Sequence, residues 1–146
     1  MKQLADIIEG QKIYHAESAA SVREVAKMMS EKNIGAVAVL ESGRLVGIFS
    51  ERDLMKRVVA AGLNPEKTTV ANVMTKEIVV GKLDDDINSA LQKMHSLGCR
   101  HLPVVDSGNL VGMVSLRDLL ELDDDTQRKR AIFLNELVTY SPDYES

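Results

Sequence analysis

Apolar and polar residues follow the same succession of patterns twice along this chain. Within 21–32, apolar residues recur at every third or fourth position, which predicts an amphipathic helix, and 86–97 shows the same spacing with Gly98 as a C-terminal stop. Two short apolar runs around a Ser-Gly pair follow each helix, which predicts a strand, a tight turn and a strand. We expect these strands over 36–41 and 45–49 in the first half and over 102–106 and 110–114 in the second.

Each half is also expected to open with a turn of helix, to continue with a short strand, and to end with a further helix. We place the opening turns at 4–8 and 70–74, the short strands near Ile13 and Tyr14 and over 78–80, and the last helices from Ser50 and Ser115. After Leu122, the apolar spacing predicts one more helix over about 124–139, which has no counterpart in the first half.

The two halves are copies of one another. The segments 34–55 and 99–120 align without gaps at an offset of 65 residues, and ten of the 22 positions are identical, where chance gives roughly one or two. The opening turns align as well, with one residue of slack. Because a unit of about 60 residues buries little surface alone, we expect the two copies to pack on each other.

This organisation predicts an α/β (α+β) fold of two pseudo-symmetric βαββα units packed through their sheets, with a cleft between the halves. We place the first unit at 1–62, a linker at 63–69, the second unit at 70–122, and a C-terminal helix and tail at 123–146. Asn64 and Pro65 are typical of such a linker.

Composition narrows the functional classes. The chain has 146 residues, 45% of them hydrophobic, which fits one folded domain or two very small ones that share a core. A net charge of -4 argues against a dedicated nucleic-acid binder, and the single cysteine excludes an internal disulfide framework. The longest apolar run, 36–40, is too short for a bilayer span, and 1–10 contains no long apolar stretch. We therefore expect a cytoplasmic protein without a signal peptide.

Candidate chemistry lies where each hairpin meets the following helix. Both copies read Gly-x-x-Ser-x-Arg-Asp, at 47–53 and at 112–118. One interpretation is structural: the Ser caps the helix, the Asp three positions later completes a capping box, and the Gly marks a bulge. The other is a nucleotide site, in which the Ser and backbone N–H groups bind phosphate, the Asp accepts the ribose hydroxyls, and the Gly lets a ligand approach the backbone.

These runs, the hairpins before them, and the segment 100–105 resemble cystathionine-β-synthase-type (CBS) domains, and the resemblance covers about 4–122. The pair is similar to a stand-alone tandem module of that family, a Bateman module. The resemblance implies an adenosine ligand (AMP, ADP, ATP, NAD or S-adenosylmethionine) held by the motif Ser and Asp, with its base on apolar and backbone groups of neighbouring strands. It also implies regulation rather than catalysis, and flat dimers formed through helix faces.

Carried onto this chain, the resemblance implies one site in each copy. In the first copy, the implied ligand-binding residues are Ile13, Tyr14, Ala36, Val37, Ser50, Arg52 and Asp53. In the second copy, they are Val79, Val80, Arg100, His101, Leu102, Pro103, Ser115, Arg117 and Asp118. Arg100 and His101 give the second site cations that the first site lacks, so a multiply charged ligand is expected to favour the second.

We therefore expect a sensor module that binds an adenosine nucleotide, with AMP, ATP or NAD favoured, and modulates an unidentified protein partner. It is expected to act as a homodimer and to need no catalytic cofactor, nucleic acid or membrane. The alternative is a ligand-independent dimerisation or interaction scaffold in which both motifs only cap helices. An enzyme has little support, since the sequence offers no candidate nucleophile.

The remaining clusters have structural interpretations. His95, Cys99 and His101 could suggest a metal site, but the first copy repeats none of them, so we expect no metal. The other clusters are acidic runs that cap helices, a basic run on a solvated helix face, and methionines that pack helices. The acidic runs are 84–86 and 123–125, the basic run is 128–130, and the methionines are Met28, Met29 and Met94.

Overall fold

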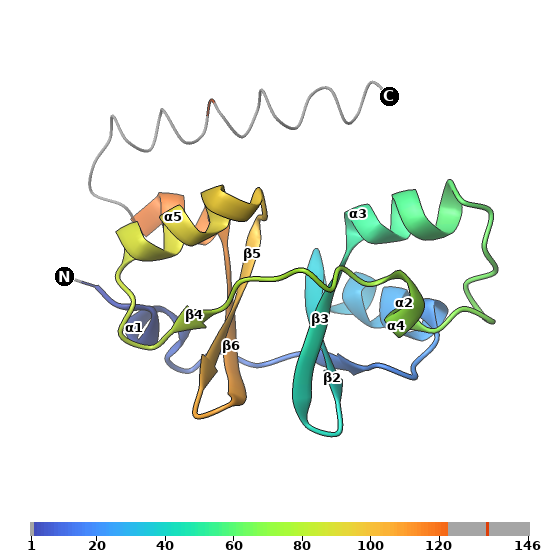
Figure 1. Cartoon of the computed structure of the whole chain (residues 1–146), viewed down its shortest axis with the longest axis horizontal. Helices are drawn as coiled ribbons and strands as arrows, with labels where there is room; N and C mark the ends of the chain where they lie inside the picture. Colours follow the sequence, from blue (N-terminus) through green and yellow to red (C-terminus); the bar gives the residue numbers. More distant parts are fainter. Residues whose placement is uncertain (1, 123–133, 135–146) are drawn as a thin grey trace.

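Each copy of the repeat forms a three-stranded sheet in the computed structural model, which describes residues 2–122 and Leu134 (Figure 1). In both sheets, the first strand pairs in parallel with the middle strand, which pairs antiparallel with the last. The strands are β1 (His15–Glu17), β2 (Ala36–Glu41) and β3 (Arg44–Ser50) in the first copy and β4 (Gly81–Lys82), β5 (His101–Asp106) and β6 (Asn109–Ser115) in the second. The halves meet where β3 and β6 lie side by side, so the predicted packing of the two units through their sheets is confirmed.

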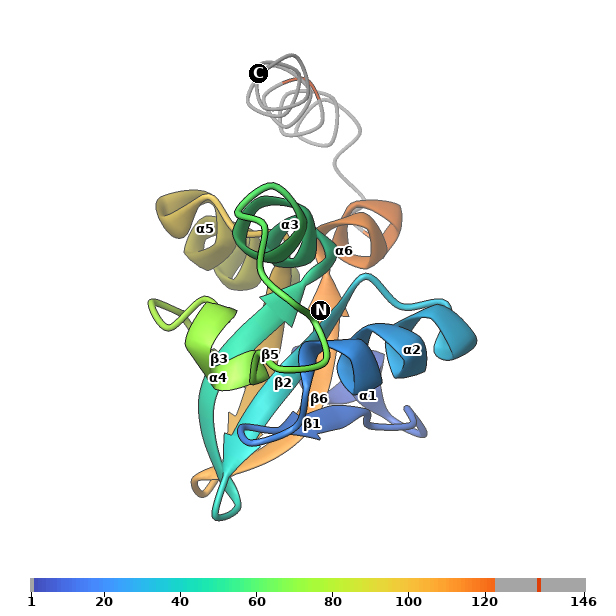
Figure 2. The ribbon, with the colours of Figure 1, turned by 90° about the vertical axis from the view of Figure 1, so that its right-hand side faces the viewer.

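The helices begin and end where capping residues allow. They are α1 (Leu4–Ile8), α2 (Val22–Lys32), α3 (Glu51–Asp53), the π-helix η1 (Leu54–Val59), α4 (Val70–Val73), α5 (Ile87–Leu97) and α6 (Leu116–Leu122). Asp86 caps α5 by accepting a hydrogen bond from the Ser89 N–H at 2.7 Å, and Gly98 ends that helix in a left-handed conformation, both as predicted. Figure 2 shows α3, α5 and α6 together on one side, above the ends of β3 and β6.

The opening helix of each copy packs in the core of the other copy. Val70 and Met74 belong to the core of the first half, whereas Leu4 and Ile8 belong to the core of the second. The Leu4 N–H also donates to the carbonyl of Asp85, at 2.9 Å. The largest fully buried side chains are Phe49, Val22, Val37, Val39, Val58 and Val70 in the first core and Leu4, Met94, Leu102, Val104, Val114 and Leu119 in the second. Each half therefore needs a segment of the other to complete its core.

Gly47 and Gly112, the two motif glycines, lie where the opening helix of one copy and the residues after it pack against the hairpin of the other copy. Each sits at a register shift in its hairpin, so the bulge interpretation is confirmed. A Cβ on Gly47 would lie 2.7 Å from Met74 Sδ and 2.8 Å from the Thr75 carbonyl oxygen, and one on Gly112 would lie 2.8 Å from Ile8 Cγ2. The interpretation in which the glycine leaves room for a ligand is wrong, because protein atoms fill that space in both copies.

Several sequence predictions differ from the structure or lie outside its described part. The short strands are β1 and β4, not the segments near Ile13 and Tyr14 or over 78–80. The parallel pairing of β1 starts opposite Ala38, in the middle of β2, so residues 13 and 14 precede the sheet. The helix after Ser50 continues as η1, for which the sequence carries no signal. The segments 123–125 and 128–130 lie outside the described residues, and so does 124–139 apart from Leu134.

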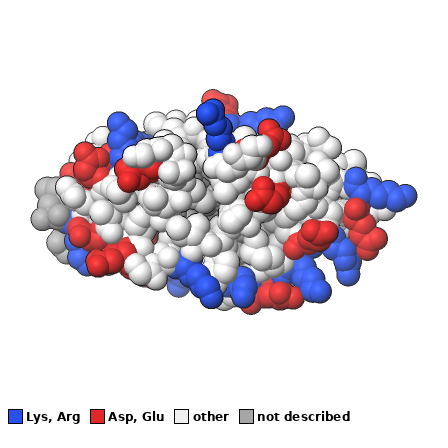
Figure 3. Space-filling view, turned by 90° about the horizontal axis from the view of Figure 1, so that it is seen from below, with Lys and Arg blue, Asp and Glu red and all other residues white. Residues whose placement is uncertain are grey.

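The face seen in Figure 3 has acidic and basic side chains mainly around its edge, with uncharged residues across its middle. Charges of both signs alternate along that edge. The described residues therefore form no continuous basic patch on this face, of the kind that nucleic-acid binding needs. No helix among the described residues is long and apolar enough to cross a membrane.

Candidate functional site

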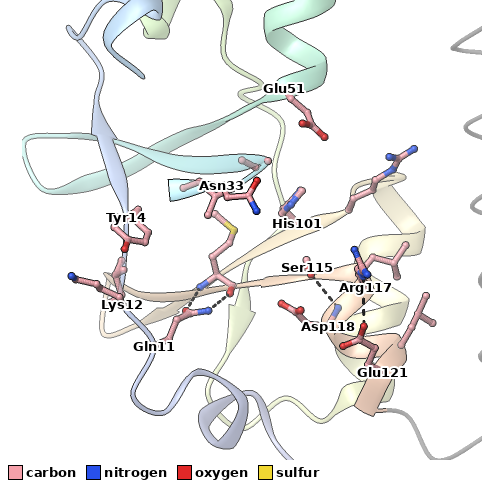
Figure 4. A pocket seen from close by; sticks show the side chains of 18 of the residues that line it. Gln11, Lys12, Tyr14, Asn33, Glu51, His101, Ser115, Arg117, Asp118 and Glu121 are labelled. Atoms are coloured by element: carbon pink, nitrogen blue, oxygen red, sulfur yellow. Dashed lines mark hydrogen bonds and ion pairs between the residues drawn. The ribbon is translucent and has the colours of Figure 1, made fainter. Parts of the chain in front are cut away.

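A cavity with a volume of about 1150 Å³ lies between the halves (Figure 4). Tyr14 and Ala36 of the first copy line one part of it, and Ser115 and Asp118 of the second copy line another. The cavity therefore joins the strand ends of one copy to the motif of the other. We call it the Asp118 cavity.

Asp118 presents an uncommitted carboxylate to this cavity. Its backbone N–H donates to Ser115 Oγ at 3.1 Å, which caps α6. Its side chain is exposed, points into the cavity, and makes no hydrogen bond or ion pair with any described residue (Figure 4). Two carboxylate oxygens in this state match the two vicinal hydroxyls of a ribose.

The opposite wall of the Asp118 cavity contains apolar and aromatic groups of the first copy beside polar ones. Ile13, which is 42% exposed, and Tyr14 lie on the segment before β1, and Ala36 begins β2. Lys32 Nζ lies 5.6 Å from the centre of the Tyr14 ring, a cation–π contact that positions the ring. Aliphatic and aromatic groups of this kind form a wall that suits a purine base.

Gln11 also lines the Asp118 cavity, and its side chain binds the β6 backbone, a contact that the sequence did not predict. Its side-chain Nε2 donates to the Met113 carbonyl at 2.8 Å, and its Oε1 accepts from the Met113 N–H at 3.0 Å. Figure 4 shows both contacts. A side-chain amide here pairs with the β6 backbone as a neighbouring strand would.

A smaller cavity, about 220 Å³ in volume, contains the first motif and is called the Asp53 cavity. The Asp53 carboxylate is buried and hydrogen-bonded. Asp53 is 6% exposed, and its Oδ2 accepts from the Ser50 N–H at 3.0 Å. The Thr75 hydroxyl donates to Oδ1 at 3.0 Å, and Arg57 Nε lies 3.6 Å from the same oxygen. The Asp53 N–H also donates to Ser50 Oγ at 3.2 Å, so the predicted capping box is complete.

The structure corrects how the expected site residues group together. Ile13, Tyr14 and Ala36 line the Asp118 cavity rather than the Asp53 cavity, and Val79 lines the Asp53 cavity. The reason is the crossing of the chain, which brings the strand ends of one copy to the motif of the other. Four of the expected residues line neither cavity: Val37, Val80, Leu102 and Pro103.

Those four side chains have other places in the fold. Val37 and Leu102 are fully buried in the two cores, and Pro103 is buried in β5. Val80 is half-buried, and its carbonyl accepts a hydrogen bond from Lys93 Nζ at 3.1 Å. Along β2, the alternation of side chains explains why Ala36 lines the cavity while its neighbour Val37 packs in the core.

The remaining expected residues divide between the cavities. Arg52 lines the Asp53 cavity and Arg117 the Asp118 cavity, where Arg117 Nε lies 3.6 Å from Glu121 Oε1. Arg100 and His101 line both cavities. Among the described residues, His95, Cys99 and His101 form no group of three metal-ligating side chains, alone or with acidic neighbours.

His101 is half-buried in the wall between the cavities, beside Arg100 and Asp118. Burial and the Arg100 charge lower the pKa of His101, and the Asp118 carboxylate partly opposes that change. The imidazole is therefore neutral at neutral pH, and it offers a ligand a hydrogen bond rather than a charge.

We expect the free energy of unfolding to decrease as the pH is lowered below about 6.5, because the unfolded chain takes up a proton on His101 that the folded chain does not. Urea denaturation between about pH 7.5 and 5 measures this decrease. It should be shallower in His101→Gln, while His95→Gln, at an exposed position, should follow the wild type. Equal pH dependence in His101→Gln and the wild type would contradict the assignment.

Comparisons with known proteins show what this chain is similar to in sequence. The CBS domain model matches the chain twice, over residues 5–60 and 70–125. The CBS domain-containing protein YhcV of Bacillus subtilis is 39% identical over 99 residues, which cover 68% of this chain and 70% of YhcV. A protein of Methanopyrus kandleri, MK0525, is 35% identical over 102 residues, and the match spans 52% of its length.

Solved structures show the same fold. A signal-transduction protein with CBS domains from Burkholderia ambifaria has a TM-score of 0.78 at 30% identity, covering 86% of this chain and 96% of that chain. The CBS domain pair of protein MJ0100 has a TM-score of 0.73 at 27% identity, covering 84% of this chain and 95% of that one. That pair was solved in complex with 5′-methylthioadenosine and S-adenosyl-L-methionine.

Proposed function

This chain belongs to the CBS-domain family, a family of regulatory modules, and from that premise we propose that it is an adenosine-ligand sensor. The ligand is AMP, ADP, ATP, NAD or S-adenosylmethionine, bound in the Asp118 cavity. Occupancy of that cavity modulates a protein partner in the cytoplasm, and the chain itself catalyses no reaction.

The observation that carries this proposal is the Asp118 carboxylate, which has no hydrogen-bonding partner among residues 2–122 and faces Ile13, Tyr14 and Ala36 across a large cavity. Ligand sites typically enclose about 300–1,000 Å³, and the Asp118 cavity, at about 1150 Å³, has room for a nucleotide. Asp118 would accept the ribose hydroxyls, and Tyr14 and Ala36 would contact the base. The adenosine compounds bound by the MJ0100 pair support the same ligand class.

Signalling would follow from where the cavity lies. Its lining comes from both copies, so a bound ligand contacts both halves at once. A ligand that binds one arrangement of the halves more tightly stabilises that arrangement, and a partner that recognises it responds to ligand concentration.

A ligand-independent scaffold is the second candidate, and the first motif favours it. Ser50 and Asp53 form a complete capping box, and Thr75 and Arg57 satisfy the remaining carboxylate positions. That motif has a sufficient structural role without any ligand.

Calorimetric titration of the purified protein with AMP, ADP, ATP, NAD and S-adenosylmethionine separates the two candidates. The sensor predicts saturable binding of at least one of them, together with a higher melting temperature when it is present. Absence of binding by protein shown by mass spectrometry to be ligand-free would favour the scaffold.

We also propose that the module forms a homodimer through the exposed apolar stripe of Met55, Val59 and Leu63, on η1 and the turn after it. Val59 is 70% exposed, and Met55 and Leu63 are 42% and 44% exposed. Helix-face dimers in the family support a second copy as the occupant.

Val59→Asp should therefore weaken dimerisation by about tenfold or more, because a carboxylate would be buried without a partner. Analytical ultracentrifugation over a concentration series measures this. Ser42→Asp, at an exposed hairpin turn, is the control and should leave dimerisation unchanged. Equal dissociation constants for the two variants would place the dimer interface elsewhere.

A further inference from the structure

We infer that only one of the two motif sites in this chain is open to an adenosine ligand, and that the Thr75 hydroxyl closes the other. The inference rests on the proposed function, because it concerns which copy of the motif performs it. It makes Thr75 the residue that sets the number of ligands bound per chain.

The closed state is visible in the contacts of Asp53. The Thr75 hydroxyl lies 3.0 Å from Oδ1 and 3.2 Å from Oδ2, so one group covers both carboxylate oxygens. The Ser50 N–H and Arg57 Nε contact the same two oxygens from other directions. A ribose could bind Asp53 only by displacing Thr75.

Thr75 is held in place by its backbone. Its N–H donates to the Ile48 carbonyl at 2.8 Å, and its carbonyl accepts from the Ile48 N–H at 3.0 Å. Arg57 Nη1 also donates to the Met74 carbonyl at 2.9 Å, so the residue before Thr75 is fixed as well. The hydroxyl is thus fixed on Asp53 by a two-strand bridge.

The equivalent place in the second motif has a different occupant. Met113 corresponds to Ile48, and there the Gln11 side-chain amide makes the two contacts that the Thr75 peptide makes with Ile48. A side-chain amide carries no hydroxyl toward the motif aspartate. Asp118 is consequently exposed and without a hydrogen-bonding partner among residues 2–122, whereas Asp53 is buried.

A difference of one residue between the copies accounts for this asymmetry. Ala16 and Gly81 are equivalent, since they pair with Val39 and Val104, which lie at the repeat offset of 65. From Ile8 to Ala16 the chain is one residue longer than from Met74, which aligns with Ile8, to Gly81, and this is the slack noted in the repeat. With the extra residue, the backbone after α1 no longer pairs with β6 and the Gln11 side chain takes its place.

The cavity volumes also indicate that the Asp53 site is closed and the Asp118 site is open. The Asp53 cavity measures about 220 Å³, below the range of ordinary ligand sites, and the Asp118 cavity measures about 1150 Å³. Thr75 lines the smaller cavity. Removing its side chain would both enlarge that cavity and take away the one hydroxyl that contacts both Asp53 oxygens.

The test counts ligands per chain by calorimetry with two probes, AMP and S-adenosylmethionine. The wild type should bind one ligand per chain, and Asp53→Asn should leave its affinity within about twofold. Thr75→Ala should bind a second ligand, and Thr75→Ala combined with Asp53→Asn should lose it again. Thr75→Ser removes the methyl group but keeps the hydroxyl, so this matched control should stay at one ligand.

Each outcome decides a separate question. Two ligands per wild-type chain, or loss of binding in a folded Asp53→Asn protein, would overturn the closure. A Thr75→Ala protein that matches Thr75→Ser would overturn the role of the hydroxyl. If the wild type binds neither probe but Thr75→Ala binds one through Asp53, the closure stands while the proposed function fails for these ligands.

Discussion

Replacing Asp118 with Ala is expected to weaken binding of AMP, or of whichever tested adenosine ligand binds the wild type, by about 100-fold. Two ribose hydroxyls would lose a charged acceptor, and each such hydrogen bond contributes about 1.5–3 kcal/mol, partly replaced by water in the variant. A 100-fold loss corresponds to about 2.7 kcal/mol. Calorimetric titration measures the change directly.

The fold should survive this substitution, because the Asp118 side chain is exposed and makes no hydrogen bond with a described residue. Asp106→Ala, which removes an equal charge at the end of β5 outside the cavity, is the matched control and should bind normally. A 2′-deoxy ligand adds a second test: the wild type should discriminate against it, and Asp118→Ala should not. Discrimination that persists in the variant would show that another group binds the ribose.

Replacing Gly47 with Ala is expected to lower the free energy of unfolding by about 3 kcal/mol. The new Cβ would lie 2.7 Å from Met74 Sδ and 2.8 Å from the Thr75 carbonyl oxygen. Met74 can rotate away, but the Thr75 carbonyl is backbone and is hydrogen-bonded to the Ile48 N–H. The substitution is therefore expected to push the Met74–Thr75 segment away from β3. Urea denaturation should show a midpoint at a lower urea concentration.

Alanine substitutions at two other glycines, where the close contacts are weaker, should lower the free energy of unfolding by smaller amounts. In Gly112→Ala the close atoms are side-chain atoms, Ile8 Cγ2 at 2.8 Å and Gln11 Oε1 at 2.9 Å, so a smaller loss of about 1–2 kcal/mol is expected. In Gly35→Ala the nearest atom is Glu51 Oε1 at 3.4 Å, and the expected change is within about 0.5 kcal/mol. Equal losses at all three positions would mean that the effect comes from general loss of chain flexibility.

Local sequence patterns predicted most elements of this fold because the forces that set them are local. The bounds of β2 and α5 follow from apolar periodicity, a Ser-Gly turn and the Asp86 and Gly98 caps. The short strand β1 was misplaced because only Ala16 of its three residues is buried. Its position is set by pairing with β2, which no pattern within 13–17 reveals.

Sequence reasoning named many of the residues that line the two cavities, but it did not predict how they group. Ser115 and Asp118 were identified from the motif, and Tyr14 and Ala36 from the family resemblance, yet the structure joins them across the copies. Thr75 and Gln11 were missed because their roles depend on contacts with residues far away in the sequence. The one signal for them was the single residue of slack between the opening turns of the repeat.

The exchange of α1 and α4 between the two cores also bears on how such a chain could arise. A single ancestral unit would have had no opening helix in its own interior, unless a second copy of the same polypeptide supplied one. Two identical chains exchanging these helices would form the same body that the duplicated gene now encodes as one polypeptide. Once both units were joined, their opening segments were free to diverge in length, and a symmetric pair of sites could become an unequal pair.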